Sequence, residues 1–406
     1  MPAASGVFKQ VAIKKETTYG VLPTASGAQL LRRVDAAFNL TKDTYESNEI
    51  RADLQAADMR HGINRVTGNL NGELSPGSYA PYLGSLLKRD FTAVAAITGQ
   101  SITIAAAAGG AFTVSRATGS WLTSGVKVGH VVRLTAGTFN ANNLNKNLFV
   151  VAVTALALTV LVLNGTTLTA EGPIASATLS LPGKTTFVPT SGHTDDSYAV
   201  EEWFSDVPRS ETYTGIKFTQ AQIQLPPSGP ATLGLTVAGQ RMGQAAGGTR
   251  YFTSPTAQSA SGIAASVNGV LRINGATQLA VTGLNFDINA NFTGDGVVGS
   301  NVVPQQFAGR LRVSGQFTAY FEDGALADAF YNESQIGLQV ALTTGSEAAA
   351  DFLTFSMSRV KLGGADKSDG EGGVVRTFPF TALLNSNGGA SAEHEQTTIA
   401  IQDSLA

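Results

Sequence analysis

The chain has 406 residues, of which 43% are hydrophobic and 14% are charged, and its formal net charge is −3. A chain this apolar can bury a large core, so wholesale disorder is excluded, and the absence of cysteine excludes a disulfide framework and thiolate-bound metal. Lys and Arg are sparse and form no basic run, which argues against a surface that grips nucleic acid.

Most of the chain predicts β strands. Apolar residues at helical spacing favour short helices at Ser78–Lys88, after a Ser-Pro-Gly start, and at Asp323–Tyr331. Elsewhere apolar and polar residues alternate, as in Gly309–Phe321, with the period of a half-buried strand. The longest largely apolar run, Phe149–Leu163, is shorter than the ~20 residues that span a bilayer. We therefore expect a buried hairpin there and no membrane partner. Met1–Val11 lacks the apolar region of a secretory signal.

An ordered series of similar segments predicts an internal duplication. Arg65–Gly68 (RVTG) recurs as Arg312–Gly315 (RVSG), and this offset of 312 − 65 = 247 superimposes the two predicted helices. Downstream the offset falls to 353 − 216 = 137, because the apolar strand at Ile216 resembles the one at Leu353. One short match arises easily by chance in a β-rich sequence, but several matches in the same order favour a duplication.

The fall in offset means that the first copy contains extra sequence. We expect a mainly β protein with a few short helices, built of two tandem β-sandwich or barrel units and a small inserted β domain. The predicted parts are 1–91 with 185–257 for the first unit, 92–184 for the insert, 258–390 for the second unit, and 391–406 for a C-terminal arm that a neighbour orders. The insert is expected to face outward, since its loops belong on the surface.

Side chains capable of catalysis or metal binding form no specific motif. The four histidines lie far apart in the sequence, and no hydrolase elbow, Walker loop or dinucleotide-binding loop is present. The acidic glycine-rich segment 363–373 could bind calcium, although a mobile hairpin tip is favoured. Five crowded carboxylates could supply acid–base catalysis, although an acidic strand facing solvent or a channel is favoured: Asp195, Asp196, Glu201, Glu202 and Asp206. We therefore expect no enzymatic activity, cofactor or metal.

A long polar stretch follows the first repeated strand in each copy, at 41–62 and at 289–308. Loops beyond about 12–15 residues are usually functional or disordered. Both signs of charge alternate along the first stretch, which suits docking on a like copy above or below; the alternative is an ordinary flexible hairpin. The candidate docking residues are Lys42, Asp43, Glu46, Glu49, Arg51, Asp53 and Arg60.

Several phrases near the start carry a family resemblance. They are KKETTYG at Lys14–Gly20, FNLTKD at Phe38–Asp43, SNEIR at Ser47–Arg51 and GELSPG at Gly72–Gly77. With these phrases the chain resembles the major tail tube proteins of long, non-contractile-tailed bacteriophages. The second copy, from about residue 279 to 384, resembles a tail-tube core in its strand–loop–strand–helix order. The insert resembles small β modules that decorate phage structural proteins.

The resemblance implies a structural virion protein, made in the host cytoplasm, that self-assembles into stacked rings. In such tubes the inner sheets of the subunits join into a barrel, and long loops and terminal arms bridge neighbouring rings. The lumen would hold the tape measure protein and later pass double-stranded DNA transiently. Tail terminator and distal tail proteins would be the partners at the two ends.

The duplication adds an expectation about ring size. Two similar units in one chain can occupy neighbouring positions of a six-fold ring, so three chains would close it with pseudo-six-fold symmetry, and a hexamer is the fallback. A channel for DNA should avoid dense cations, so we expect a net-negative lumen to which Glu73 and Glu322 contribute. A carbohydrate-contacting adhesin built on β-sandwiches is the competing function, and a hydrolase that uses the crowded carboxylates is a third.

Overall fold

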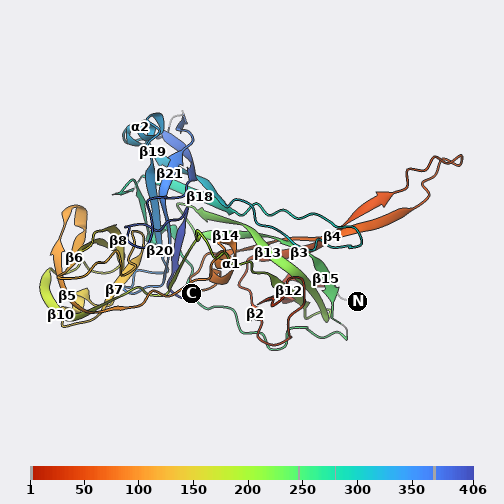
Figure 1. Ribbon diagram of the computed structural model, residues 1–406, viewed down its shortest axis with the longest axis horizontal. Helices are drawn as coiled ribbons and strands as arrows, with labels where there is room; N and C mark the ends of the chain where they lie inside the picture. Colours follow the sequence, from red (N-terminus) through yellow and green to blue (C-terminus); the bar gives the residue numbers. More distant parts are fainter. Residues whose placement is uncertain (1–2, 246, 279, 369–371) are drawn as a thin grey trace.

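The computed structural model describes residues 3–245, 247–278, 280–368 and 372–406. Within those residues it has 24 strands and only two α helices, which confirms the predicted mainly β class. Figure 1 shows a body of sheets with a long hairpin projecting from one side and a small barrel at the opposite end. No helix in the described residues is long and apolar enough to cross a membrane. Short 3₁₀ turns lie at Gly6–Phe8, Ala108–Gly110, Ala141–Asn143 and Ser266–Asn268.

A first set of strands forms one antiparallel ladder, which we call the first unit. Its strands are, in spatial order, β2 (Gln29–Leu30), β1 (Lys9–Lys15), β12 (Tyr198–Phe204), β13 (Arg209–Leu225), β14 (Thr232–Gly239), β4 (Met59–Glu73) and β3 (Asp35–Glu46). The short β15 (Arg241–Gln244) also pairs with β13. Helix α1 (Ala80–Leu86) packs against β13, with Pro81 in its first turn, where the missing N–H costs no helical bond.

A second set of strands, the second unit, repeats this ladder in the same order. Its strands are β17 (Ala276–Thr277), β16 (Gly269–Ile273), β20 (Ile336–Thr343), β21 (Phe352–Leu362), β23 (Val375–Ala382), β19 (Arg312–Tyr320) and β18 (Val281–Asn289). The short β22 (Asp366–Lys367) continues the line of β21 along β23. Helix α2 (Ala325–Tyr331) follows β19 as α1 follows β4.

The pairing registers show which residues of the two units correspond. Ile216 lies opposite Tyr198 and Val360 lies opposite Ile336, and in both ladders an irregularity follows that pair. Ile216 therefore corresponds to Val360, at an offset of 360 − 216 = 144, whereas the sequence predicts Leu353. The offset of 247 between β4 and β19 agrees with the registers on both sides of these strands.

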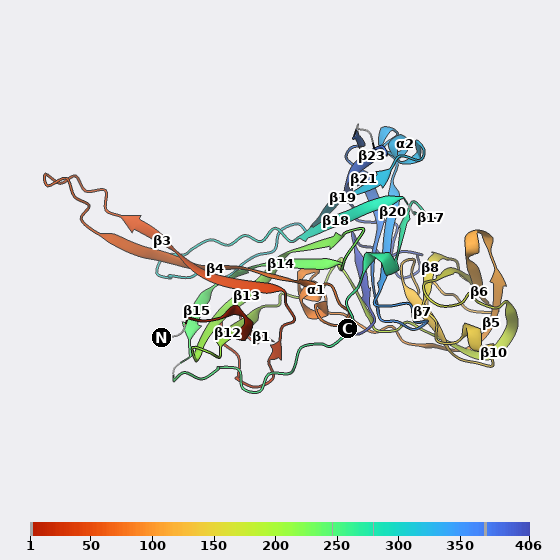
Figure 2. The ribbon, with the colours of Figure 1, turned by 180° about the vertical axis from the view of Figure 1, so that it is seen from behind.

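The two units share one sheet because the second half of β13 pairs with β18. The resulting sheet runs β3–β4–β14–β13–β18–β19–β23–β22, and every pairing in it is antiparallel. We call it the through-sheet; Figure 2 shows its strands passing from the arm side to the second unit. One hydrophobic core lies beneath both units and includes Phe38, Phe218, Phe286, Phe317 and Phe355. Burying each such ring is worth about 1.5–3 kcal/mol.

The region between α1 and β11 (Lys184–Phe187) forms a closed six-stranded barrel with its own core, which includes Trp121 and Leu148. Its strands are β5 (Ile97–Ala106), β6 (Phe112–Arg116), β7 (Val131–Ala136), β8 (Leu148–Val153), β9 (Ala157–Val162) and β10 (Glu171–Ser180). β8 and β9 form the antiparallel hairpin expected from the apolar run there. The barrel packs on the second unit through Phe149 against Phe352. The exact division of the chain into domains stays a prediction.

The end of the chain is held by the molecule itself. β24 (Ala400–Asp403) pairs with β11 on one side and with β21 on the other, and Ile399 and Ile401 are buried. These residues therefore differ from the neighbour-ordered arm expected for 391–406. The Asp403 carboxylate accepts hydrogen bonds from the Gly77 N–H, at 2.9 and 2.8 Å, and from Leu405. Burial raises the pKa of Asp403 to about 6, although these hydrogen bonds oppose the shift.

This shift gives a testable pH dependence. Because folded Asp403 binds its proton more tightly than the unfolded chain does, its contribution to stability is present at low pH and falls as the pH rises from about 4 to 6. The free energy of unfolding of the wild type, relative to Asp403→Asn, should fall by about 2 kcal/mol between pH 4.5 and 7. Urea denaturation at several pH values measures it, with the exposed Asp58→Asn as control. A difference that does not change with pH would contradict the assignment.

Candidate assembly surfaces

One face of the through-sheet packs on the core, and the other carries mostly uncharged polar side chains. Cross-strand pairs place these side chains on a common surface, as where Gln222 lies opposite Asp287, which lies opposite Ser314. We call it the polar sheet face. Its uncharged polar members are Asn39, Thr41, Thr67, Asn69, Asn71, Gln220, Gln222, Gln224, Thr232, Thr236, Asn285, Asn289, Ser314, Gln316, Thr318, Thr377 and Thr381.

The charges on the polar sheet face nearly balance. Its carboxylates are Asp35, Glu73, Asp287 and Asp366, and its cations are Arg65 and Arg312, with Lys361 of the neighbouring β21 opposite Thr381. Burial raises the pKa of Asp287 above its ordinary value. The face is therefore slightly acidic and lacks the dense cations that hold a polyanion.

The two residues predicted for a lumen lie in different places. Glu73 ends β4 and belongs to the polar sheet face, where it lies opposite Thr232. Glu322 lies beyond the end of β19, in the connection to α2, and lines a recess with Tyr320 and Arg376. The structure thus brings only Glu73 onto the polar sheet face.

The outer parts of β3 and β4 form a hairpin that projects far from the body, here called the arm (Figures 1 and 2). All seven candidate docking residues lie on it. Two local ion pairs occupy its tip: Arg51 to Asp53 at 2.8 Å and Arg60 to Asp58 at 2.9 Å. Nearer the body, Arg65 approaches Asp43 at 4.0 Å, while Lys42, Glu46 and Glu49 are exposed on the arm. Exposed pairs contribute about 0–1 kcal/mol, so they do not stabilise the arm much.

The arm also exposes large apolar side chains that the charge pattern did not reveal. Ile50 and Leu54 near the tip are almost fully exposed, at 102% and 95%, and Tyr45 and Met59 are more than half exposed. Exposed apolar groups concentrated on a projecting segment indicate a protein–protein contact. In the sequence, these four residues could have been recognised as apolar residues within an otherwise polar stretch.

The corresponding loop of the second unit, between β18 and β19, runs back along the first unit (Figure 1). The Asn64 N–H donates to the Asn301 carbonyl at 2.7 Å, and the Gln240 amide donates to the Val303 carbonyl at 2.8 Å. The buried Lys217 donates to the Gln306 carbonyl at 3.0 Å. The second of the two polar stretches therefore contacts the first unit of its own chain.

Each of the five crowded carboxylates contacts its own partners. Asp195 contacts Lys217 at 2.7 Å and Lys88 at 3.1 Å. Burial alone would raise the pKa of Asp195, but these two lysines outweigh it and hold the pKa below its usual value. The remaining contacts are Asp196 with Lys15, Glu201 with Ser210 and the Phe252 N–H, Glu202 with Lys9, and Asp206 with the Ser5 N–H. These contacts join β1, β12 and β13 and assemble no pair of free carboxylates.

No metal site emerges from the residues that the structure describes. They contain no group of three or more His, Asp or Glu side chains placed to hold an ion. The calcium hypothesis for segment 363–373 falls partly outside the described residues, because 369–371 are not among them.

Comparison with known protein families agrees with this architecture. A family model described as phage tail tube protein matches residues 9–382, which is nearly the whole chain. A comparison with curated proteins finds no match. The match spans both units and the inserted barrel. The resemblance noted in the sequence is thereby confirmed, and the chain belongs to the phage tail tube protein family.

Proposed function

We propose that three copies of this chain close into a ring whose through-sheets form one barrel, and that stacked rings build the wall of a phage tail tube. In this proposal each chain contributes two ring positions. Residues 1–91 with 185–257 form one position, and residues 258–390 form the other. The barrel at 92–184 lies on the outside.

The observation that carries the proposal is the pair of unpaired edges at the two ends of the through-sheet. Among the described residues, β3 pairs only with β4, and β22 pairs only with β23. Unpaired strand edges favour further strand pairing. Because the two edges differ and lie at opposite ends, joining them is a head-to-tail contact, which builds a closed ring when its rotation closes.

Strand number supports three chains. Each through-sheet has eight strands, so three chains supply 24 and six chains supply 48. For strands about 4.8 Å apart and tilted by about 40°, these barrels would be roughly 50 and 100 Å across between backbones. The smaller barrel leaves room for one DNA duplex after side chains are added, and the larger one is far wider than a duplex needs.

The polar sheet face would line the bore. The core, the remaining strands of the two units and the inserted barrel all lie on the opposite side of the through-sheet. A narrow lumen could not hold them. A lining of amides and hydroxyls with few cations would let DNA slide, because each phosphate contact with a cation strengthens binding. The same bore would hold the tape measure protein, with Glu73 in its wall, and terminator and distal tail proteins would bind its ends.

The arms would connect successive rings, with Ile50 and Leu54 buried against the next ring. Burying each of these side chains is worth about 1.5–3 kcal/mol, whereas the exposed ion pairs of the arm contribute little. In this proposal the charges set the register of stacking and the apolar tip supplies its affinity.

The ring size is tested by native mass spectrometry with electron microscopy of the purified full chain. We expect rings with three times the chain mass of 41.9 kDa. Rings of six chains would overturn the trimer, and a monodisperse monomer that binds glycans would favour the adhesin instead.

The role of the arm is tested by Ile50→Ser with Leu54→Ser. Because both side chains are exposed in a single chain, the thermal unfolding temperature should not change, while assembly of rings into tubes should weaken by at least about tenfold. The matched control is Leu156→Ser, which replaces a half-exposed apolar residue on the barrel. Tubes of normal length from the double variant would contradict this role; sedimentation of assembled tubes measures it.

A further inference from the structure

We infer that the strand edge at residues 364–368 of one chain pairs antiparallel with β3 of the next chain, in a register that sets Asp366 opposite Asn39. The inference rests on the proposed ring and goes beyond it by naming the residues in contact. Its basis is that the chain already contains one copy of this junction, between β13 and β18.

The internal junction has a defined register. Gln222 lies opposite Asp287, with Gln220 opposite Asn289 two residues away. On its other side Gln222 lies opposite Gly234 of β14. Each residue of this junction has a counterpart in the opposite unit, and the shared ladders identify it.

The first counterpart is that of Gln222. Gly234 lies opposite Asn71, and Thr377 lies opposite Thr318. Thr318 corresponds to Asn71, because the two are separated by the offset of 318 − 71 = 247. Gly234 therefore corresponds to Thr377. Asp366 lies opposite Thr377, as Gln222 lies opposite Gly234, so Gln222 corresponds to Asp366.

The second counterpart is that of Asp287. Asp287 lies opposite Ser314, and Asn39 lies opposite Thr67, with 314 − 67 = 247 again. Asp287 therefore corresponds to Asn39. Replacing both residues of the internal pair by their counterparts gives Asp366 opposite Asn39, and the same register sets Gly364 opposite Thr41 and Ser368 opposite Ala37.

The chemistry of the inferred junction matches that of the internal one. On the polar sheet face, Gln222 lies opposite Asp287, so an amide residue faces a carboxylate residue across the internal junction. Asn39 opposite Asp366 would repeat this combination with the two sides exchanged. Both Asn39 and Asp366 are exposed in a single chain. Lys367 falls on the core side of the junction, and a charged residue there is a common guard against wrong pairing of an open edge.

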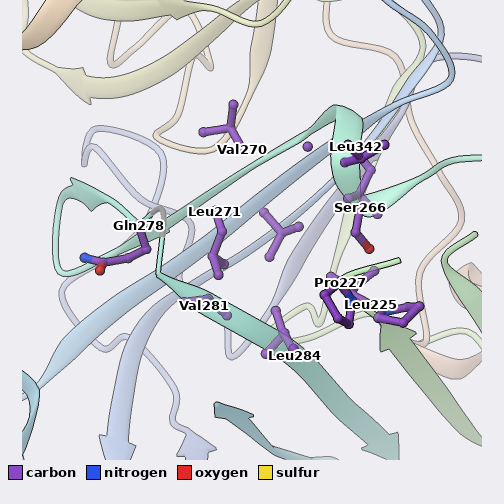
Figure 3. Close-up of a pocket in the computed structure, with 14 residues that line it drawn as sticks. Leu225, Pro227, Ser266, Val270, Leu271, Gln278, Val281, Leu284 and Leu342 are labelled. Atoms are coloured by element: carbon purple, nitrogen blue, oxygen red, sulfur yellow. The ribbon is translucent and has the colours of Figure 1, made fainter. Parts of the chain in front are cut away.

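A groove beside each junction gives independent support. In the second unit, Val267, Leu271 and Leu284 line an open groove of about 190 Å³, and Leu225–Pro227 at the end of β13 lie against it (Figure 3). The corresponding positions of the first unit, Val7, Val11 and Ala36, line a wider groove of about 770 Å³.

The difference between the grooves follows from the chain's connectivity. The first unit supplies Leu225–Pro227 to the groove of the second unit, whereas the described residues place no such segment in the groove of the first unit. A second copy of the chain, joined at β3, would bring its Ser368, opposite Ala37, to the rim of this groove.

Engineered disulfides test the register, because the natural chain has no cysteine. The full-length variant Asn39→Cys with Asp366→Cys should form covalent rings on oxidation, seen as trimers on a non-reducing gel. Thr41→Cys with Asp366→Cys shifts the register by two residues on the same face and should give about tenfold less product, since Cα atoms beyond about 7 Å are not bridged. Gln222→Cys with Asp287→Cys is the matched control and should cross-link within one chain.

The outcomes separate this inference from the proposed function. Covalent trimers at the predicted pair, with rings in electron microscopy, support both. Two outcomes with normal rings would overturn the register and leave the proposed ring standing. In the first, only the shifted pair cross-links. In the second, neither intermolecular pair cross-links although the internal control does. If properly folded variants and wild type both fail to form rings, the proposed function falls and this inference with it.

Discussion

The pairing of β13 with β18 joins two repeated units into one sheet, and most of the molecule's other features depend on it. Backbone N–H and C=O groups at a strand edge need partners, and inside the chain the second half of β13 supplies them to β18. Within the described residues, the same arrangement leaves the outer edges of β3 and β22 unpaired at the two ends of the sheet. A chain built this way satisfies its internal junction by itself, and in the proposed ring its outer edges would be paired by neighbouring chains.

The two units are alike in strand order but differ at their surfaces. The loop between β18 and β19 lies on the first unit, whereas the corresponding β3–β4 hairpin projects as the arm. Helix α1 is largely buried, whereas α2 has no buried residue and Tyr331 on it is 85% exposed. In both comparisons, an element that is covered within the chain corresponds to an element of the other unit that stays exposed. This asymmetry agrees with the proposed ring, in which one junction of each chain would be internal and the other would join a neighbour.

Much of this fold was predictable from the sequence, because local patterns carry it. The two helices occur within the predicted segments, and apolar alternation correctly indicated a mainly β chain. The correspondence of Ile216 failed by seven residues because alternating apolar residues look alike at many registers, and only the pairing partners distinguish them. The C-terminal segment looked polar, yet Ile399 and Ile401 alternate into the core. Ile50 and Leu54 were overlooked because charged residues surround them, and their exposure is a property of the folded hairpin.

The central claim is that the free edges of the through-sheet become paired when the chain assembles. Backbone hydrogen exchange in dissociated subunits and in assembled tubes tests this claim directly. The account predicts that amides of β3 and of residues 364–368 exchange far more slowly in tubes, while amides at the β13–β18 junction are protected equally in both states. Equal exchange of β3 and residues 364–368 in subunits and tubes would contradict it.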